Sequence, residues 1–266
     1  MPTYALLGAT GSTGSAVLRC LLSDPAQTTD KITLNIFIRS KSKLMRLFPD
    51  IQSTTRSNIH INIIESTPDD TPGLQKALRD AEIIFQCIAA NDVTPKVSVA
   101  EDTVKAVLKA MRGLHEEQGE GYVTPAVLQL RAAPLNETFS HQSPWLIESM
   151  IKFALHYTYS DIQRGCDLFV SAKKMNPTLL GYIFVDTGAV HDADGTECTG
   201  HRLTIEGPLA PAISYADTGA GMCEIARRVE EFKGLGVGIV ATGRVRLTWG
   251  TNAYYLAMGV KARIIG

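Results

Sequence analysis

The chain has 266 residues, of which 45% are hydrophobic and 20% charged, and its formal net charge is −1. This length can bury a large core, and the near-neutral charge argues against nucleic acid as a partner, since duplex binding needs an excess of Lys and Arg. No run approaches the roughly 20 apolar residues of a membrane span, and five widely spaced cysteines fit reduced thiols. We therefore expect a cytoplasmic protein with a small-molecule substrate and no nucleic-acid or membrane partner.

The first 130 residues alternate between short apolar runs and segments with helical spacing. The apolar runs predict strands at residues 4–7, 32–38, 59–64, 83–88 and 127–130. Helices are predicted at residues 15–22, 41–48, 71–79 and 97–111. Strands and helices in alternation indicate βαβ units. The expected fold class is α/β, a Rossmann-type doubly wound parallel sheet.

The second half is less regular. It predicts one helix over 150–169, a buried strand over 178–185, an amphipathic helix over 218–232 and a strand over 234–240. Residues 192–200 read as a polar loop, and residues 249–265 as an apolar, aromatic tail. No linker divides the chain, so we expect residues 1–266 to form one domain. The later loops, at about 190–215 and 245–266, would form a small C-terminal substrate cap.

A glycine-rich turn between the first strand and the first helix is the most specific motif. Gly8 allows a tight turn, Gly11 leaves room for a pyrophosphate beside the backbone, and Gly14 lets the helix pack against the strand. The anion would then meet free N–H groups at a helix N-terminus. Three hydroxyl side chains add donors: Thr10, Ser12 and Thr13. The turn predicts dinucleotide binding.

The end of the second predicted strand discriminates between dinucleotides. An NAD site usually carries an acidic residue there to bind the ribose hydroxyls. This chain has Arg39 and Ser40 instead, followed by Lys41, Lys43 and Arg46. A guanidinium can hold a 2′-phosphate with paired hydrogen bonds, so we expect NADPH/NADP+ as the cofactor. A solvated basic surface is the alternative.

Three segments together resemble a known family. They are the glycine turn, Arg39-Ser40 after the second strand, and Cys87-Ile-Ala-Ala-Asn91 after the fourth. The chain resembles an atypical short-chain dehydrogenase/reductase of the NmrA-like branch. Within that branch, the opening 4–11 and the length are similar to the averufin oxidase A family of fungal secondary metabolism. The resemblance implies a Rossmann fold, NADP(H) and an aromatic polyketide substrate, such as an anthraquinone or xanthone precursor. It also implies that Ala89, Ala90 and Asn91 border the nicotinamide.

The usual catalytic pair of that superfamily, a Tyr followed four residues later by a Lys, is absent. The nearest equivalent is Tyr159, with Gln163 at the Lys position, and a neutral amide lowers a phenol pKa far less than an ammonium. The usual serine after the fifth strand is also missing from residues 128–133. His156, one helical turn before Tyr159, could replace the lysine in a His–Tyr relay.

Other readings of these polar residues stay open. Tyr157 and Tyr159 could simply pack in the cap, with His156 on the surface, and His141 with Ser143 is a second candidate group. Asp161 adds a carboxylate to the same helix. Segments 192–195 and 198–201 superficially resemble metal-binding runs but lack the remaining ligands, so we expect no metal site.

We therefore expect an NADPH-dependent oxidoreductase acting on an aromatic polyketide intermediate. One alternative is a non-redox cyclase, dehydratase or isomerase on the same scaffold. Another is an NmrA-like regulator that senses dinucleotides without chemistry. The helices at 97–111 and 150–169 correspond to those that pair in short-chain dimers, so a homodimer is also open.

Overall fold

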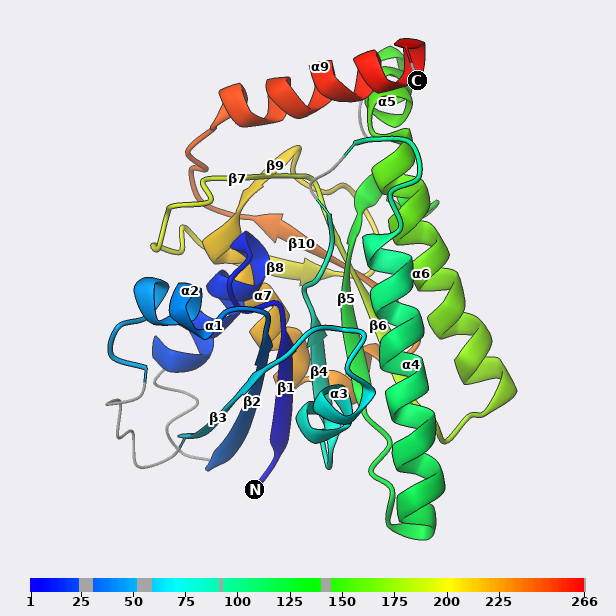
Figure 1. Ribbon diagram of the computed structural model, residues 1–266. Helices are drawn as coiled ribbons and strands as arrows, with labels where there is room; N and C mark the ends of the chain where they lie inside the picture. The colour runs from blue at the N-terminus through cyan, green and yellow to red at the C-terminus, as the bar shows by residue number, and fades with distance from the viewer. Residues whose placement is uncertain (24–30, 52–58, 91–92, 140–144, 266) are drawn as a thin grey trace.

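The computed structural model describes residues 1–23, 31–51, 59–90, 93–139 and 145–265. Within them the chain forms an eight-stranded sheet in the order β3-β2-β1-β4-β5-β6-β10-β8 and a two-stranded sheet of β7 and β9 (Figure 1). Every recorded pairing is parallel except that between β10 and β8. The predicted doubly wound sheet is confirmed, with an antiparallel edge strand that the sequence did not indicate.

The elements have the following bounds. The large sheet contains β1 (Thr3–Leu7), β2 (Ile32–Ile38), β3 (Ile59–Glu65), β4 (Ile83–Gln86), β5 (Ala126–Ala132), β6 (Gly181–Thr187), β8 (His201–Thr204) and β10 (Gly236–Ala241). The small sheet contains β7 (Ala189–His191) and β9 (Ala212–Ser214). The helices are α1 (Ser12–Ser23), α2 (Lys41–Leu47), α3 (Thr71–Leu78), α4 (Val99–Gln118), α5 (Trp145–Ala154), α6 (His156–Met175), α7 (Tyr215–Arg227), α8 (Val229–Phe232) and α9 (Trp249–Ile265). Two short 3-10 turns flank β5.

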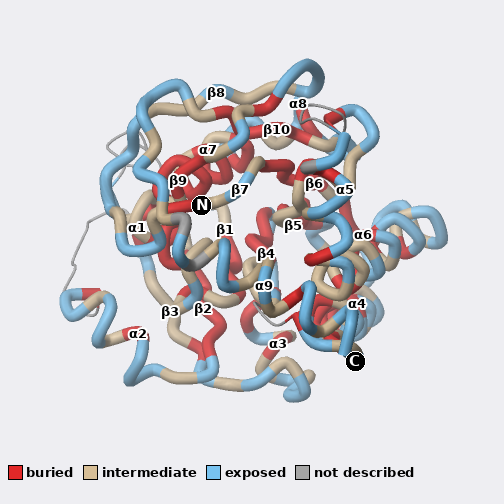
Figure 2. The backbone as a smooth tube through the Cα atoms, turned by 90° about the horizontal axis from the view of Figure 1, so that it is seen from above, coloured by how far each residue is buried: buried red, intermediate tan, exposed pale blue. Residues whose placement is uncertain are grey.

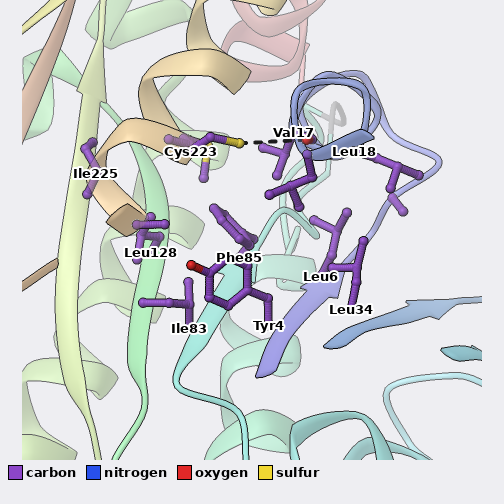
Figure 3. Packing of buried hydrophobic residues seen from close by; sticks show 14 of the residues in the cluster. Tyr4, Leu6, Val17, Leu18, Leu34, Ile83, Phe85, Leu128, Cys223 and Ile225 are labelled. Carbon is purple, nitrogen blue, oxygen red and sulfur yellow. Dashed lines mark hydrogen bonds between the residues drawn. The ribbon is translucent and has the colours of Figure 1, made fainter. Parts of the chain in front are cut away.

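The inner strands of the large sheet are buried on both faces, as their nearly continuous apolar runs predict. One face packs against α1 and α7 through Val17, Leu18 and Met222, and Figure 3 shows part of this cluster. The other face packs against α3, α4 and α6, for example through Val104 and Phe169. In Figure 2 the buried residues accordingly gather in the sheet and on the inner sides of the helices.

The approach of α7 to α1 is unusually close because small residues line both helices. A Cβ at Gly219 would lie 2.5 Å from the carbonyl carbon of Ala16. The Cys223 thiol donates to the Val17 carbonyl at 3.8 Å (Figure 3). The start of α7 is therefore held against the start of α1, beside the glycine turn.

The second half corrects several expectations. The helix predicted over 150–169 is two helices, α5 and α6, because the chain turns at Leu155, whose φ and ψ are −95° and 16°. The helix predicted over 218–232 begins earlier and breaks at Arg228 into α7 and α8. The tail is a helix, α9. The strands β7, β8 and β9 have three or four residues each and were missed, because such short runs carry no periodic signal.

Candidate functional site

The glycine turn lies where the strand order reverses, between β1 and β4. Ligands of doubly wound folds bind at this switch point, outside the carboxyl ends of the strands. The Gly8 N–H donates to the Phe37 carbonyl of β2 at 3.1 Å, and Gly11 N–H donates back to the Gly8 carbonyl at 3.0 Å. Because α1 begins at Ser12, its first N–H groups lie at this edge.

The three glycines of the turn meet different demands. Gly8 has a φ of +88° and lies against the chain after β4, where a Cβ would be 3.0 Å from the Cys87 carbonyl oxygen. A Cβ at Gly14 would lie 2.2 Å from the Gly8 carbonyl oxygen, so no side chain fits there. A Cβ at Gly11 would approach no described atom closer than 3.5 Å, and the residue is exposed. Packing within the described chain therefore requires Gly8 and Gly14 to be glycine, but not Gly11.

The hydroxyl residues of the turn, Thr10, Ser12 and Thr13, are half-buried. Ser12 is hydrogen-bonded to Tyr215, the first residue of α7, whose pKa is raised by burial and lowered in part by that bond. Tyr255 of α9 lies near enough to Tyr215 to affect the same pKa. Sequence reasoning placed Tyr255 in the aromatic tail but missed Tyr215, because its contacts bring together segments far apart in the chain.

At the end of β2, Arg39 is exposed, and no side-chain hydrogen bond or ion pair is recorded for it in the described part of the chain. Ser40 is the N-cap of α2, because its hydroxyl accepts from the Lys43 N–H at 3.2 Å. The Lys43 side chain is exposed. Glu65, at the end of β3, accepts from the Lys41 N–H at 2.7 Å. A carboxylate therefore stands at the start of α2 among the predicted cations, which sequence reasoning also missed.

The segment after β4 runs past the glycine turn. Ala89 is exposed and Ala90 is half-buried, whereas Asn91 lies outside the described residues. Burial raises the pKa of the Cys87 thiol to about 12. A raised pKa disfavours the thiolate, which is the form of cysteine that acts as a nucleophile.

The predicted catalytic helix is α6. Tyr159 is half-buried, and burial raises its pKa to about 12. His156 is exposed, and its recorded ring contact is with Tyr157, at 5.4 Å between centroids. The Gln163 amide donates to the Asp167 carboxylate one turn further along, at 2.8 Å. The described geometry does not bring His156 and Gln163 onto Tyr159.

The other polar groups near the catalytic helix have structural partners. The buried Asp161 carboxylate accepts from the Ala100 and Glu101 N–H groups, at 2.9 and 3.0 Å, and so caps α4 from outside. At the end of β5, Arg131 makes two hydrogen bonds to the buried Asp186, at 2.7 and 2.8 Å. Arg131 of this ion pair lies in residues 128–133, the segment in which the superfamily usually carries its serine. His141 and Ser143 lie outside the described residues.

The helix α9 lies across the top of the molecule in Figure 1, above the carboxyl ends of the strands. Its first turn is fixed to β7, because the Thr248 N–H donates to Nδ1 of the buried His191 at 3.1 Å. The Asn252 amide nitrogen lies 3.3 Å from Nε2 of the same ring. Further along, Gly259 packs on α5, where a Cβ would lie 1.9 Å from the Ala154 carbonyl oxygen.

The runs that superficially resembled metal sites have other partners. The Cys198 thiol donates to the Ala216 carbonyl at 3.5 Å, and His201 pairs with Glu224 at 3.0 Å. Within the described ranges, no group of three His, Cys, Asp or Glu side chains could hold a metal ion. Nor does that part of the chain contain a helix long and apolar enough to cross a bilayer.

The fold is shared with solved dinucleotide-binding proteins. A short-chain dehydrogenase/reductase from Veillonella parvula, solved in complex with NADP, matches with a TM-score of 0.64 at 18% identity, over 91% of this chain and 95% of that one. The sheet order, with the glycine turn at its switch point, defines the class as an α/β fold of the Rossmann type, which the chain shares with that short-chain dehydrogenase/reductase.

Sequence comparison identifies the family. Averufin oxidase A of Dothistroma septosporum is 44% identical over 99% of this chain and 92% of its own length. Averufin oxidase A of Aspergillus flavus is 40% identical over 99% and 91%. No family model matches the chain. The chain belongs to the averufin oxidase A family, as the resemblance implied, and is an oxidoreductase. The enzyme reading is therefore favoured over the dinucleotide-sensing regulator.

Proposed function

We propose that the protein binds NADP(H) at the glycine turn and carries out a redox reaction on an aromatic polyketide of the averufin class. The observation that carries this proposal is the room for a side chain at Gly11. A Cβ there would make only an ordinary contact, 3.5 Å from the Gly8 carbonyl oxygen, so packing within the described chain does not require glycine, whereas the close approach of an external group to the backbone would. A pyrophosphate at the N-terminus of α1 fits that requirement.

The residues that would hold the cofactor follow from the same geometry. The α1 N–H groups and the hydroxyls of Thr10, Ser12 and Thr13 would bind the pyrophosphate. Arg39, with Ser40 and Lys43 nearby, would bind the 2′-phosphate, and Ala89, Ala90 and Asn91 would border the nicotinamide. When bound, NADP(H) supplies or accepts the hydride. Glu65 opposes the 2′-phosphate electrostatically, so the NADPH preference depends on the balance between this carboxylate and Arg39.

Tyr159 is the proposed proton donor. Burial raises its pKa to about 12, so it keeps its proton at neutral pH. Such a group can donate a proton to a substrate oxygen but is a poor base. Of the two directions of hydride transfer, a protonated Tyr159 favours the reduction of a carbonyl. The ring of His156 contacts Tyr157 and the amide of Gln163 donates to Asp167, so each would have to exchange that contact to act on Tyr159.

The substrate would enter under the cap formed by residues of about 190–215 and 245–266. The inner side of α9 carries Asn252 and Tyr255, and Tyr255 lies close to Tyr215 beside the turn. Two aromatic rings at this position suit a flat aromatic ligand, whose faces they can contact. The second candidate is a non-redox cyclase, dehydratase or isomerase. It is favoured because Gln163, which stands at the position of the usual catalytic lysine, donates its hydrogen bond to Asp167.

The test is calorimetric titration of the purified protein with NADPH, NADP+, NADH and NAD+, followed by incubation of averufin with the cofactor that binds. We expect NADPH to bind at least about tenfold tighter than NADH, and the nicotinamide absorbance to change as averufin is consumed. Conversion of averufin without that change would establish the non-redox function. Absence of dinucleotide binding would overturn the proposal.

A further inference from the structure

The outer surface of α9, which belongs to the cap, and of the neighbouring helix α5 is apolar, although nothing in the described chain covers it. Of the seventeen exposed large apolar side chains in the described residues, eight lie on α5 and α9. We define them as the cap face: Trp145, Leu146, Met150 and Phe153 on α5, with Tyr254, Val260, Ile264 and Ile265 on α9. The two helices pack against each other at Ala154 and Gly259, and exposed apolar side chains that gather on neighbouring elements mark an interaction site in a folded protein.

The pattern of α5 is inverted relative to an ordinary surface helix. Its carboxylate, Glu148, is 9% exposed, whereas Trp145 and Met150 are 76% and 64% exposed. Glu148 pairs with Lys152 at 2.6 Å. The acidic residue therefore faces the protein and the large apolar residues face outward, which is the arrangement of a helix whose outer side contacts an apolar medium.

The charges of α9 are all positive, whereas the charge of Lys152 on α5 is paired with Glu148. The helix α9 contains no acidic residue but carries Lys261 and Arg263, both exposed. The Arg263 guanidinium lies 5.2 Å from the centre of the Phe153 ring, within the cap face. Lys152 is 43% exposed beside it. An apolar surface with exposed Lys and Arg, and no exposed carboxylate on the same helices, is complementary to anionic lipid headgroups over acyl chains.

We propose that the cap face docks on the surface of an anionic phospholipid membrane. A second copy of the chain would fit less well, because α5 and α9 of that copy offer no exposed carboxylate to pair with Lys261 and Arg263. The expectation of no membrane partner rested on the lack of a spanning run. The apolar residues of α5 and α9 are interrupted in sequence, and the two helices lie side by side only in the fold (Figure 1). Docking would place the carboxyl ends of the strands toward the bilayer. The docking proposal does not depend on the proposed reaction.

The test is flotation of the full chain with vesicles of phosphatidylcholine alone or with 30% phosphatidylserine. Two variants probe the surface: Ile264→Ser with Ile265→Ser, and Lys261→Gln. The control is Val170→Ser with Met175→Ser on α6, which are 39% and 71% exposed away from the cap. Thermal unfolding of each variant reports whether it folds.

We expect binding to the serine-lipid vesicles at least fivefold above binding to the neutral ones, and weaker binding at high salt. The isoleucine variant should bind at least tenfold less, Lys261→Gln about two- to fivefold less, and the control like the parent. Failure to float with either vesicle would overturn the proposal, as would equal losses in the control. A concentration-dependent dimer abolished by the isoleucine variant, without vesicle binding, would assign the cap face to a second copy.

Discussion

The hydroxyl groups of Ser12 and Tyr215 are hydrogen-bonded to each other, which joins the glycine turn to the first residue of α7. The Ser12 hydroxyl is also a proposed donor to the pyrophosphate, so Tyr215 competes with the cofactor for it. Tyr215→Phe should lower the free energy of unfolding of the free protein by about 1 kcal/mol, the net value of one hydrogen bond. It should tighten NADPH binding about two- to fivefold.

Thermal unfolding and calorimetry measure the two effects, with Tyr254→Phe, which is 60% exposed on α9, as the control. Weaker NADPH binding by Tyr215→Phe would contradict the competition and would mean that the phenol itself contacts the cofactor.

The glycines at positions 11 and 14 should respond differently to alanine. Gly11→Ala should change the free energy of unfolding by less than about 0.5 kcal/mol, because its Cβ meets only an ordinary contact at 3.5 Å. It should nevertheless weaken NADPH binding at least about tenfold, because the methyl group would stand between the backbone and the pyrophosphate. Gly14→Ala should destabilise the fold by about 2 kcal/mol or more. Chemical denaturation with calorimetry separates the two; full affinity in Gly11→Ala would refute the assigned role of the turn.

The cofactor preference should depend on Arg39 and Glu65 in opposite senses. Arg39→Ala should reduce the NADPH-to-NADH affinity ratio from about tenfold to near one, since paired hydrogen bonds to the 2′-phosphate are lost. Glu65→Gln keeps an oxygen for the Lys41 N–H but removes the negative charge, and should tighten NADPH binding about threefold. Glu82→Gln makes the same charge change directly before β4, at the amino ends of the strands, and serves as the control. An unchanged ratio in Arg39→Ala would show that the basic residues are merely solvated.

His191 should make stability depend on pH. Its burial lowers its pKa, and its Nδ1 must stay unprotonated to accept from the Thr248 N–H. Above the ordinary pKa of about 6.5, both the folded and the unfolded states carry neutral histidine. As the pH falls below that value, the unfolded chain gains a proton that the folded chain resists, so the free energy of unfolding decreases.

We expect a loss of about 1 kcal/mol between pH 7 and 5.5, measured by urea denaturation. His191→Asn should be less stable overall but should lack this part of the pH dependence. His60→Gln, at an exposed site on β3, should keep it. The same slope in His191→Asn as in the parent would rule out His191 as its source.

The first half of the fold could be predicted for two reasons. Buried parallel strands are continuous apolar runs, and the spacing of the glycines indicates a tight turn between a strand and a helix. Gly8 and Gly14 are needed by the chain itself, as the 3.0 and 2.2 Å approaches show. The turn at Leu155 gave no sequence signal, since neither Pro nor Gly stands there; the neighbouring Ala154 packs against α9, a tertiary contact that sequence periodicity does not report.

The polar residues were harder to assign than the glycines. Asp161 was grouped with a catalytic cluster and is a helix cap, while Glu65 and Tyr215 were overlooked because their partners are distant in the chain. A carboxylate that caps a helix and one that transfers a proton look alike in sequence. Only the two N–H groups that converge on Asp161 distinguish them.

Tyr159 is expected to donate a proton and to serve poorly as a base. Tyr159→Phe should lower turnover of averufin about 10²-fold or more, whereas His156→Ala should lower it less than threefold, because His156 is exposed and contacts Tyr157.

In the oxidative direction, which needs the phenolate, the rate should keep rising toward the pKa of about 12. Gln163→Lys would place an ammonium one turn away and should move that rise to lower pH by about one unit. Nicotinamide absorbance followed across the pH range measures both effects. Full activity in Tyr159→Phe would exclude this tyrosine, and a pH profile unmoved by Gln163→Lys would show that residue 163 does not reach it.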